Sequence, residues 1–319
     1  MDTITKKEEK KQHRKLIFKR IKENKQVYLM MLPVVAFFLI FSYFPMYGII
    51  IAFKDYRPSL GILRSPFSKP FYIHFKSVFD TPYFFRAMKN TLIISLIKII
   101  FCFPAPIILA LMMNELKSKT YKKVVQTIVY LPNFISWVIF GSLVYDIFGF
   151  DGVINSIRSL MGLSAKGYMS DGRYYYLILI VFSIIKDAGW GSIIYMAAMS
   201  AVNPSLYEAA EIDGCGRIKK IIHVTLPCIV PIIMIQLLLS IGNIMNAGFD
   251  AIFNTYNKNL YDVADILDTY IYRVGLEQGS FSMATAIGLF KSVINFALLL
   301  SANFIVKKVN GTGIYDVEQ

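Results

Sequence analysis

Four neutral polar residues recur at helical spacing inside a long apolar stretch. Gln236, Ser240, Asn243 and Asn246 are separated by four, three and three positions, which places them along one face of a helix. Amide and hydroxyl groups both donate and accept hydrogen bonds, so this stripe suits a ligand rich in hydroxyl groups. The alternative is a structural role in which the amides bridge neighbouring helices, and the pattern alone leaves both interpretations open.

Four charged residues also fall deep inside apolar stretches: Lys98, Lys186, Asp187 and Lys291. A charge in such a place is costly, so it pairs with another group, extends toward a polar interface or faces a functional path. Lys186 and Trp190 are one helical turn apart and predict a shared face on which a cation and an aromatic ring touch a ligand, including an acidic one. Structural pairing is the competing interpretation for all four charges.

These residues belong to a chain whose composition is that of a membrane protein. Of its 319 residues, 55% are hydrophobic and only 17% are charged, which exceeds the apolar content of a soluble domain. About 20 apolar residues cross the hydrocarbon layer as a helix, because lipid cannot satisfy an open backbone. We therefore expect an all-α integral membrane protein with six transmembrane helices in a domain of residues 29–306. The apolar runs lie near 29–53, 90–114, 124–147, 174–200, 224–248 and 283–306.

The distribution of lysine and arginine predicts the orientation. Residues 1–28 carry a dense basic cluster next to the first span, which indicates a cytoplasmic N-terminus attracted to anionic lipid. Six crossings then place the tail of residues 307–319 and the loop of residues 203–227 in the cytoplasm as well. The expected location is the bacterial cell membrane, with multiple passes.

Several other functions are not supported by the residues. The net charge of +13 is concentrated beside a membrane helix, so we do not expect nucleic-acid binding. His13, His74 and His223 are too scattered to form a metal site. The sequence has no glycine-rich phosphate loop with a lysine, no paired carboxylates and no nucleophile with its base. We expect neither an enzyme nor a cofactor bound by this chain.

The loop of residues 203–227 contains a short helix with signals at both ends. Asn203 can cap a helix that starts at Pro204, and Gly214 after Asp213 permits a left-handed stop. A helix of about three turns is marginal alone in water, so we expect it to dock on a partner. Its alanines leave a shallow face and its carboxylates can meet a partner's cations.

The residues of this loop resemble a known family motif. Glu208-Ala209-Ala210, Asp213-Gly214, Gly216 and Leu226-Pro227 resemble the EAA loop of the permease subunits of bacterial binding-protein-dependent ABC importers. Cys215 departs from the usual alanine but is small and apolar. The resemblance implies the type I ABC importer permease fold and a coupling helix that fits a groove on an ATPase subunit. It implies ATPase coupling for Glu208, Ala209, Ala210, Asp213, Gly214, Gly216, Leu226 and Pro227.

Further stretches are similar to carbohydrate-uptake permeases of the oligosaccharide or polysaccharide branch. They are residues 75–91 and 268–292, FPAPIILALMMNEL and YLPNFISWVIFGSL. The resemblance implies a heterodimer with a second related permease, two ATPase subunits that use ATP and Mg, and an external solute-binding protein. In the family's maltose permease the fifth span supplies sugar contacts; counted from Leu226-Pro227, Ser240 falls at one contact and Asn243 and Asn246 within about one residue of two others.

Two other functions remain as alternatives to carbohydrate import by alternating access. An ion-coupled secondary carrier needs a buried carboxylate relay, for which Asp187 is the one central candidate. An ABC permease for a solute other than a sugar would share the coupling loop and differ in its pathway.

Overall fold

The computed structural model describes residues 23–310, and over this range it consists of helices and loops without a strand. Most of the basic N-terminal segment and residues 311–319 lie outside the described residues. The longer helices are α2 (Lys25–Phe38), α5 (Pro82–Phe101), α6 (Pro104–Asn114), α7 (Lys119–Tyr130), α8 (Trp137–Phe148), α9 (Val153–Leu160), α10 (Gly172–Ser200), α11 (Pro204–Ile212), α13 (Leu226–Gly242) and α17 (Phe281–Asn310). The predicted start of the tail at residue 307 falls inside α17.

Six helical stretches in the described residues are long and apolar enough to cross a membrane, which confirms the all-α membrane fold. Several of them are interrupted where the sequence carries proline. The second crossing consists of two helices, α5 and α6, because Pro104 and Pro106 follow the end of α5. This crossing begins at Pro82, earlier than the predicted residue 90. The six stretches are Lys25–Phe53, Pro82–Asn114, Trp137–Leu160, Gly172–Ser200, Arg217–Gly242 and Phe281–Phe304.

The continuous third span predicted at residues 124–147 is wrong. Helix α7 ends at Tyr130, a short 3-10 turn η3 (Leu131–Phe134) contains Pro132, and α8 starts at Trp137. The backbone is extended at Ile135 and Ser136, and the Ser136 hydroxyl accepts a hydrogen bond from the Ile139 N–H at 3.4 Å. Proline removes a helical donor and serine caps a new helix, so the apolar run is divided between two helices of different direction.

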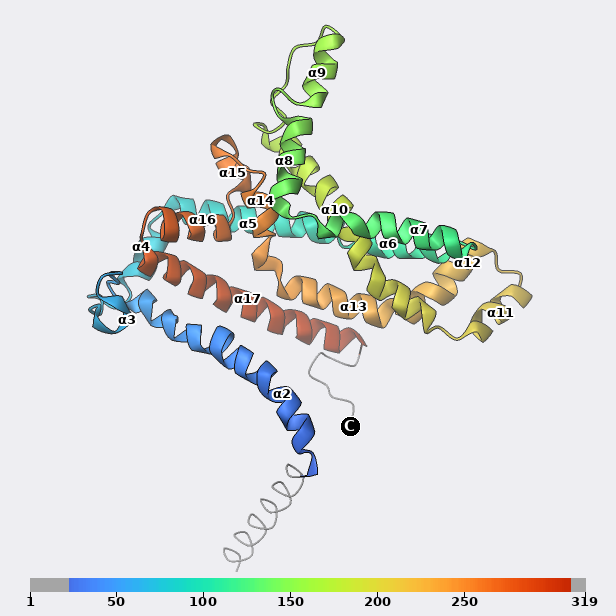
Figure 1. The fold of residues 1–319 in the computed structure, drawn as a ribbon, viewed down its shortest axis with the longest axis horizontal. Helices are drawn as coiled ribbons and strands as arrows, with labels where there is room; N and C mark the ends of the chain where they lie inside the picture. The colour runs from blue at the N-terminus through green and yellow to red at the C-terminus, as the bar shows by residue number, and fades with distance from the viewer. Residues whose placement is uncertain (1–22, 311–319) are drawn as a thin grey trace, which may run out of the picture.

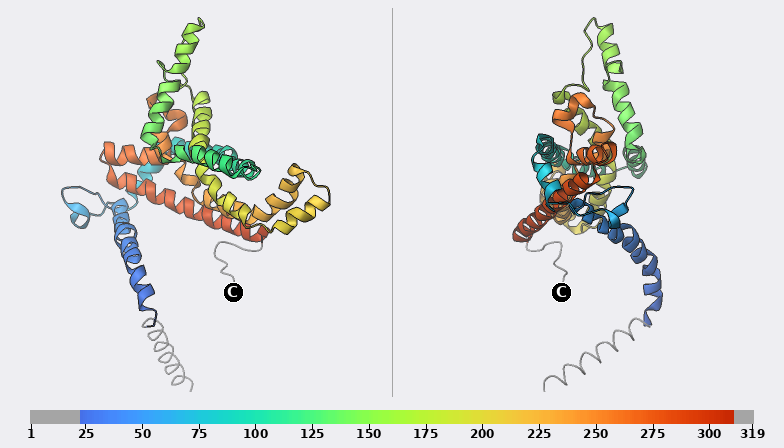
Figure 2. Two further views of the ribbon diagram at one scale, coloured as in Figure 1. Left: turned by 45° about the vertical axis from the view of Figure 1, so that its right-hand side comes forward. Right: turned by 90° about the vertical axis from the view of Figure 1, so that its left-hand side faces the viewer.

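The helices form an elongated bundle (Figure 1). The long axis of the bundle is formed by α5, α6, α13 and α17. Helix α11 lies at one end, and the other end carries the short helices α3 (Gly61–Arg64), α4 (Ile73–Phe79) and α16 (Leu267–Tyr272). Helices α8 and α9 project steeply from it. The C-terminal part of the first span packs against α17, whereas α2 diverges from the rest of the bundle (Figures 1 and 2) and has no buried residue. This large apolar surface is therefore uncovered in the single chain.

Helices α7 and α10 make a close contact at Gly189. A Cβ at Gly189 of α10 would lie 1.8 Å from the carbonyl oxygen of Val129 at the end of α7. Only a residue without a side chain lets α10 approach the backbone of α7 so closely. This contact fixes the position of the break between α7 and α8 against the middle of α10.

Candidate functional site

A cavity of about 1010 Å³ lies among α5, α10, α13 and the loop that follows α13. Most of its lining is apolar, with a small set of polar groups that converge on it, as is typical of ligand sites. The polar and aromatic side chains that line it include Ser95, Lys98, Phe103, Asn133, Asp187, Trp190, Tyr195, Gln236, Ser240, Asn243 and Asn246.

The fifth span does not continue as a helix to residue 248, which corrects the predicted range of 224–248. Helix α13 ends at Gly242, and a 3-10 turn η5 (Ile244–Asn246) leads to two residues with positive φ, Ala247 at 40° and Gly248 at 89°. A non-glycine residue rarely adopts this conformation, so Ala247 stores backbone strain beside the cavity.

Side chains from other spans satisfy the backbone groups that this break releases. Ser95 donates to the carbonyl of Ile244, and the Lys98 ammonium donates to the carbonyl of Ala247 at 3.0 Å. The Asn295 amide donates to the carbonyl of Gly242 at 2.6 Å. Irregular backbone at membrane depth is tolerated only where such partners exist or where it lines a cavity, and here both conditions hold.

All four residues of the predicted polar stripe line the cavity, although two of them are not on a helix. The Ser240 hydroxyl donates to the carbonyl of Gln236 at 2.9 Å. The Asn246 side-chain amide N–H donates to the side-chain oxygen of Asn243 at 3.2 Å. Among the described residues, the Gln236 amide has no hydrogen-bond partner. The stripe therefore presents amide and hydroxyl oxygens, and one unpaired amide, to the cavity.

The predicted face shared by Lys186 and Trp190 is not formed. Trp190 lines the cavity, but the Lys186 ammonium turns away to the break between α7 and α8, where it donates to the carbonyls of Pro132 at 3.3 Å, Asn133 at 3.1 Å and Ile135. The side chain is buried beneath aromatic rings. One helical turn along a sequence does not fix the direction of a long flexible side chain, and the unpaired carbonyls attract the cation.

Three residues outside the stripe bring a charged group or an amide to the cavity: Lys98, Asp187 and Asn133. The first two were recognised as charges within spans, which is the signal that points to them. Asn133 carries no such signal, because it reaches the cavity through the break after α7. Lys291, the remaining charge within a span, pairs with Asp268 at 2.5 Å and joins α17 to α16.

Helix α11 is capped as the sequence predicts. The Asn203 side chain accepts a hydrogen bond from the Ser205 N–H at 3.1 Å, and Pro204 occupies the first turn. At the other end Gly214 has φ of 73°, the Gly214 N–H donates to Glu211, and the Cys215 N–H donates to Ala210 at 2.9 Å. This pair of bonds is the Schellman motif, which ends a helix at a glycine.

The surface of α11 is largely open. Glu208, Ala209, Asp213, Gly214 and Gly216 are exposed, and Ala210 is buried against the rest of the loop. The helix also presents apolar side chains: Ile212 is 87% exposed. An apolar residue so exposed on a projecting helix marks a surface suited to a partner.

Two contacts hold α11 to the fifth span. The Tyr207 and Thr225 hydroxyls are hydrogen-bonded at 3.0 Å, and Lys220 pairs with Glu211 at 3.2 Å. Thr225 immediately precedes Leu226 and Pro227, which open α13. Helix α11 is therefore linked by direct contacts to the span that carries Gln236 and Ser240.

Comparison with known proteins decides the family. Residues 103–311 match the model of the binding-protein-dependent transport system inner membrane component. The chain belongs to this family. It is thus a multi-pass component of a transport system in the plasma membrane, and its family is one of transporters and not of enzymes.

Relatives of this permease support the same assignment. It is 42% identical to Protein LplB of Bacillus subtilis (strain 168), over 92% of each chain. It is also 42% identical to the polygalacturonan/rhamnogalacturonan transport system permease protein YteP of the same organism, over 96% of this chain and 95% of that protein. Among solved structures, a chain of a bacterial ABC transporter involved in the import of the acidic polysaccharide alginate has a TM-score of 0.82, with 41% identity over 92% of this chain and 99% of that one. The type I permease fold is confirmed.

Proposed function

We propose that this permease moves an oligosaccharide across the membrane. The passage for the oligosaccharide is the cavity lined by α5, α10, α13 and the segment that follows α13. The observation that carries the proposal is the convergence of neutral amides, a hydroxyl and Trp190 on one space of about 1010 Å³ among membrane helices. Amides and hydroxyls match the hydrogen bonds of sugar hydroxyls, and an indole ring packs on the apolar face of a sugar.

The relatives favour a carbohydrate over another solute. One of them is named for polygalacturonan and rhamnogalacturonan, and the similar solved structures are of an alginate importer. Lys98 and Asp187 give the passage one cation and one anion. An ion-coupled carrier needs a relay of buried carboxylates. The one carboxylate in this cavity is accompanied by an ammonium group, so the cavity does not offer such a relay.

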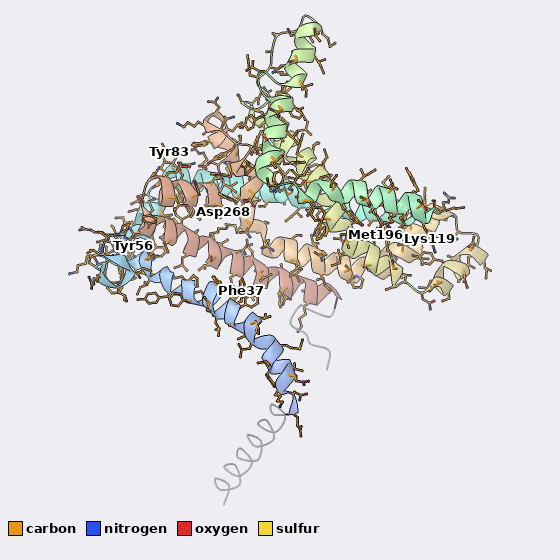
Figure 3. All side chains as sticks on the ribbon, viewed as in Figure 1. Phe37, Tyr56, Tyr83, Lys119, Met196 and Asp268 are labelled. Atoms are coloured by element: carbon orange, nitrogen blue, oxygen red, sulfur yellow. The ribbon has the colours of Figure 1, made fainter. Side chains whose placement is uncertain are left out.

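The driving force comes from other subunits in this proposal. Helix α11 docks on one of two ATPase subunits, which bind ATP and Mg in the cytoplasm, and a second related permease completes the passage. The exposed surface of α11 and its direct link to α13 support this role. The α11 end of the bundle and both termini are then cytoplasmic, and an external solute-binding protein docks at the opposite end, near Tyr56 and Tyr83 (Figure 3).

The passage is tested by removing the unpaired amide of Gln236. In proteoliposomes that contain both permeases and the ATPases, with loaded binding protein outside, Gln236→Leu is expected to lower oligosaccharide uptake about two- to thirteenfold at limiting cargo. This is the effect of one lost hydrogen bond of about 0.5–1.5 kcal/mol. Gln126→Leu, on α7 outside the cavity lining, is the matched control.

The same assay separates the alternatives. Uptake should continue when the proton and sodium gradients are collapsed and ATP is retained; uptake that stops would indicate an ion-coupled carrier. If Gln236→Leu and Gln126→Leu transport at the same rate as the unmodified protein, the cavity is not the passage.

A further inference from the structure

A second, smaller cavity lies at the end of the bundle opposite α11. Its volume is about 490 Å³, and its lining includes Tyr83, Arg86, Tyr261, Tyr270, Arg273 and Gln278. These side chains come from the start of α5, from α15 (Tyr261–Ala264), from α16 and from the turn that follows it. Figure 3 shows Tyr83 at this end of the molecule, far from Lys119 at the α11 end. Arginines beside tyrosine rings at an entrance point to an anionic ligand with flat apolar faces.

Arg86 has hydrogen-bonding capacity that the protein does not use. Its Nη1 donates to Asp262 at 2.6 Å, and its guanidinium lies 5.1 Å from the centre of the Tyr83 ring. Its Nε is buried and has no hydrogen-bond partner among the described residues. An unsatisfied donor on a charged group is costly, so an acceptor that reaches this Nε is bound favourably; because the atom is shielded from solvent, a neighbouring side chain must move to admit it.

Arg273 is occupied, in contrast to Arg86. Both of its terminal nitrogens donate to the carboxylate of Asp265, which is fully buried, and its guanidinium packs 4.5 Å from the centre of the Tyr261 ring. It therefore shapes the wall of the cavity and carries no spare charge. Asp262, the partner of Arg86, is 83% exposed in its side chain, so that ion pair is weak and can exchange with another carboxylate.

We propose that this cavity is an entrance site for the carboxylate of an acidic glycan, held on the side edge of Arg86 with its sugar ring against the tyrosines. The site rests on the proposed function and names the class of cargo. A planar carboxylate fits one guanidinium edge with two parallel hydrogen bonds, which a neutral hydroxyl cannot form. Tyr270 lines the same cavity, and a tyrosine hydroxyl is protonated near neutral pH, so it can donate a hydrogen bond to the same anion.

The test compares charged and uncharged forms of one cargo. Reconstituted complete importer with its binding protein is supplied with tetragalacturonate, with the methyl ester of the same tetramer and with a tetramer from alginate. Arg86→Gln is expected to raise the half-saturating concentration of acid-loaded binding protein about tenfold and to change that for the methyl ester less than twofold. The binding protein is the same in every sample, so a change confined to the acidic cargo arises in the permease.

Two further variants guard against a simple folding defect. Arg86→Lys keeps the charge but loses the side edge, so it should behave nearly as Arg86→Gln does. Gln278→Glu adds a negative charge at an exposed position of the lining, and a several-fold effect restricted to the acidic cargo is expected. The control is Arg64→Gln, the same change at an exposed arginine of α3 outside the lining, which should alter nothing.

Each other outcome overturns the site. Equal losses with the acid and the ester mean that Arg86 is structural, and no loss with either means that Arg86 does not contact the cargo. Weaker docking of glycan-free binding protein would assign the carboxylate to that protein instead of the glycan. Unmodified importer that takes up the methyl ester but neither acid refutes the entrance site and leaves the proposed function intact, whereas importer that takes up none of the three refutes the proposed function.

Discussion

Lys186 is the buried cation whose removal most clearly separates a structural role from contact with cargo. Its ammonium group donates to three carbonyls at the break between α7 and α8, and it lies 5.4 Å from the centre of the Trp137 ring. Hydrogen bonds between membrane helices contribute about 0.6–2 kcal/mol each. Loss of all three, with three carbonyls left unpaired, should therefore destabilise Lys186→Met by about 2–5 kcal/mol.

The assay is unfolding of the purified permease in mixed detergent micelles as the fraction of SDS is raised, followed by helical circular dichroism. Lys186→Met is expected to unfold at a clearly lower SDS fraction than the unmodified protein. Lys123→Met makes the same chemical change at an exposed position of α7 and should unfold with the unmodified protein. In uptake, the protein that remains folded should transport acidic and neutral glycans in the original ratio.

A different result would refute this reasoning. If Lys186→Met unfolds as the unmodified protein does but loses uptake of acidic glycans alone, the ammonium group faces cargo and the carbonyl contacts are not its function.

Two further predictions concern positions where the backbone limits the side chain. Gly189→Ala places a methyl group 1.8 Å from the carbonyl of Val129, so the helices must separate; we expect poor assembly with the partner permease, and normal yield of an intact complex on size-exclusion chromatography would contradict the packing. Glu208→Ala should reduce ATP hydrolysis stimulated by loaded binding protein while leaving membrane insertion unchanged, and Glu115→Ala, at an exposed position after α6, is the control. Full stimulation in the Glu208 variant would argue against a coupling role for α11.

The short helix α11 could be predicted almost to the residue because its signals are local. Asn203 caps the backbone two residues away, Pro204 needs no donor, and Gly214 accepts a left-handed conformation, so the sequence within one loop contains the whole explanation. The third span shows the limit of the same reasoning. Hydropathy over residues 124–147 averages across Pro132 and Ser136, and the change of direction becomes evident only when the local backbone preferences are given more weight than the apolar run.

Long side chains were harder to place than short ones. The spacing of Lys186 and Trp190 correctly places both on one region of α10, yet their functional atoms reach different environments. The ammonium group is directed by carbonyls some fifty positions earlier in the chain. These carbonyls lack helical partners because the helix breaks between α7 and α8, and hydropathy does not indicate this break. A contact of this kind depends on tertiary structure, and no periodicity within one helix contains it.

The four residues of the polar stripe line one cavity, but only two of them lie on the predicted helix. Gln236 and Ser240 are on α13, whereas Asn243 and Asn246 reach the same cavity from the irregular segment after Gly242. That segment persists because Lys98 of α5 satisfies its carbonyl at Ala247, and Lys98 itself lines the cavity. The side chain that permits the break is thus one of the groups that cargo would meet, so a ligand that attracts this ammonium group competes with the backbone for it. Such competition would couple occupancy of the passage to the conformation of the fifth span, the same span that Tyr207 and Thr225 join to α11.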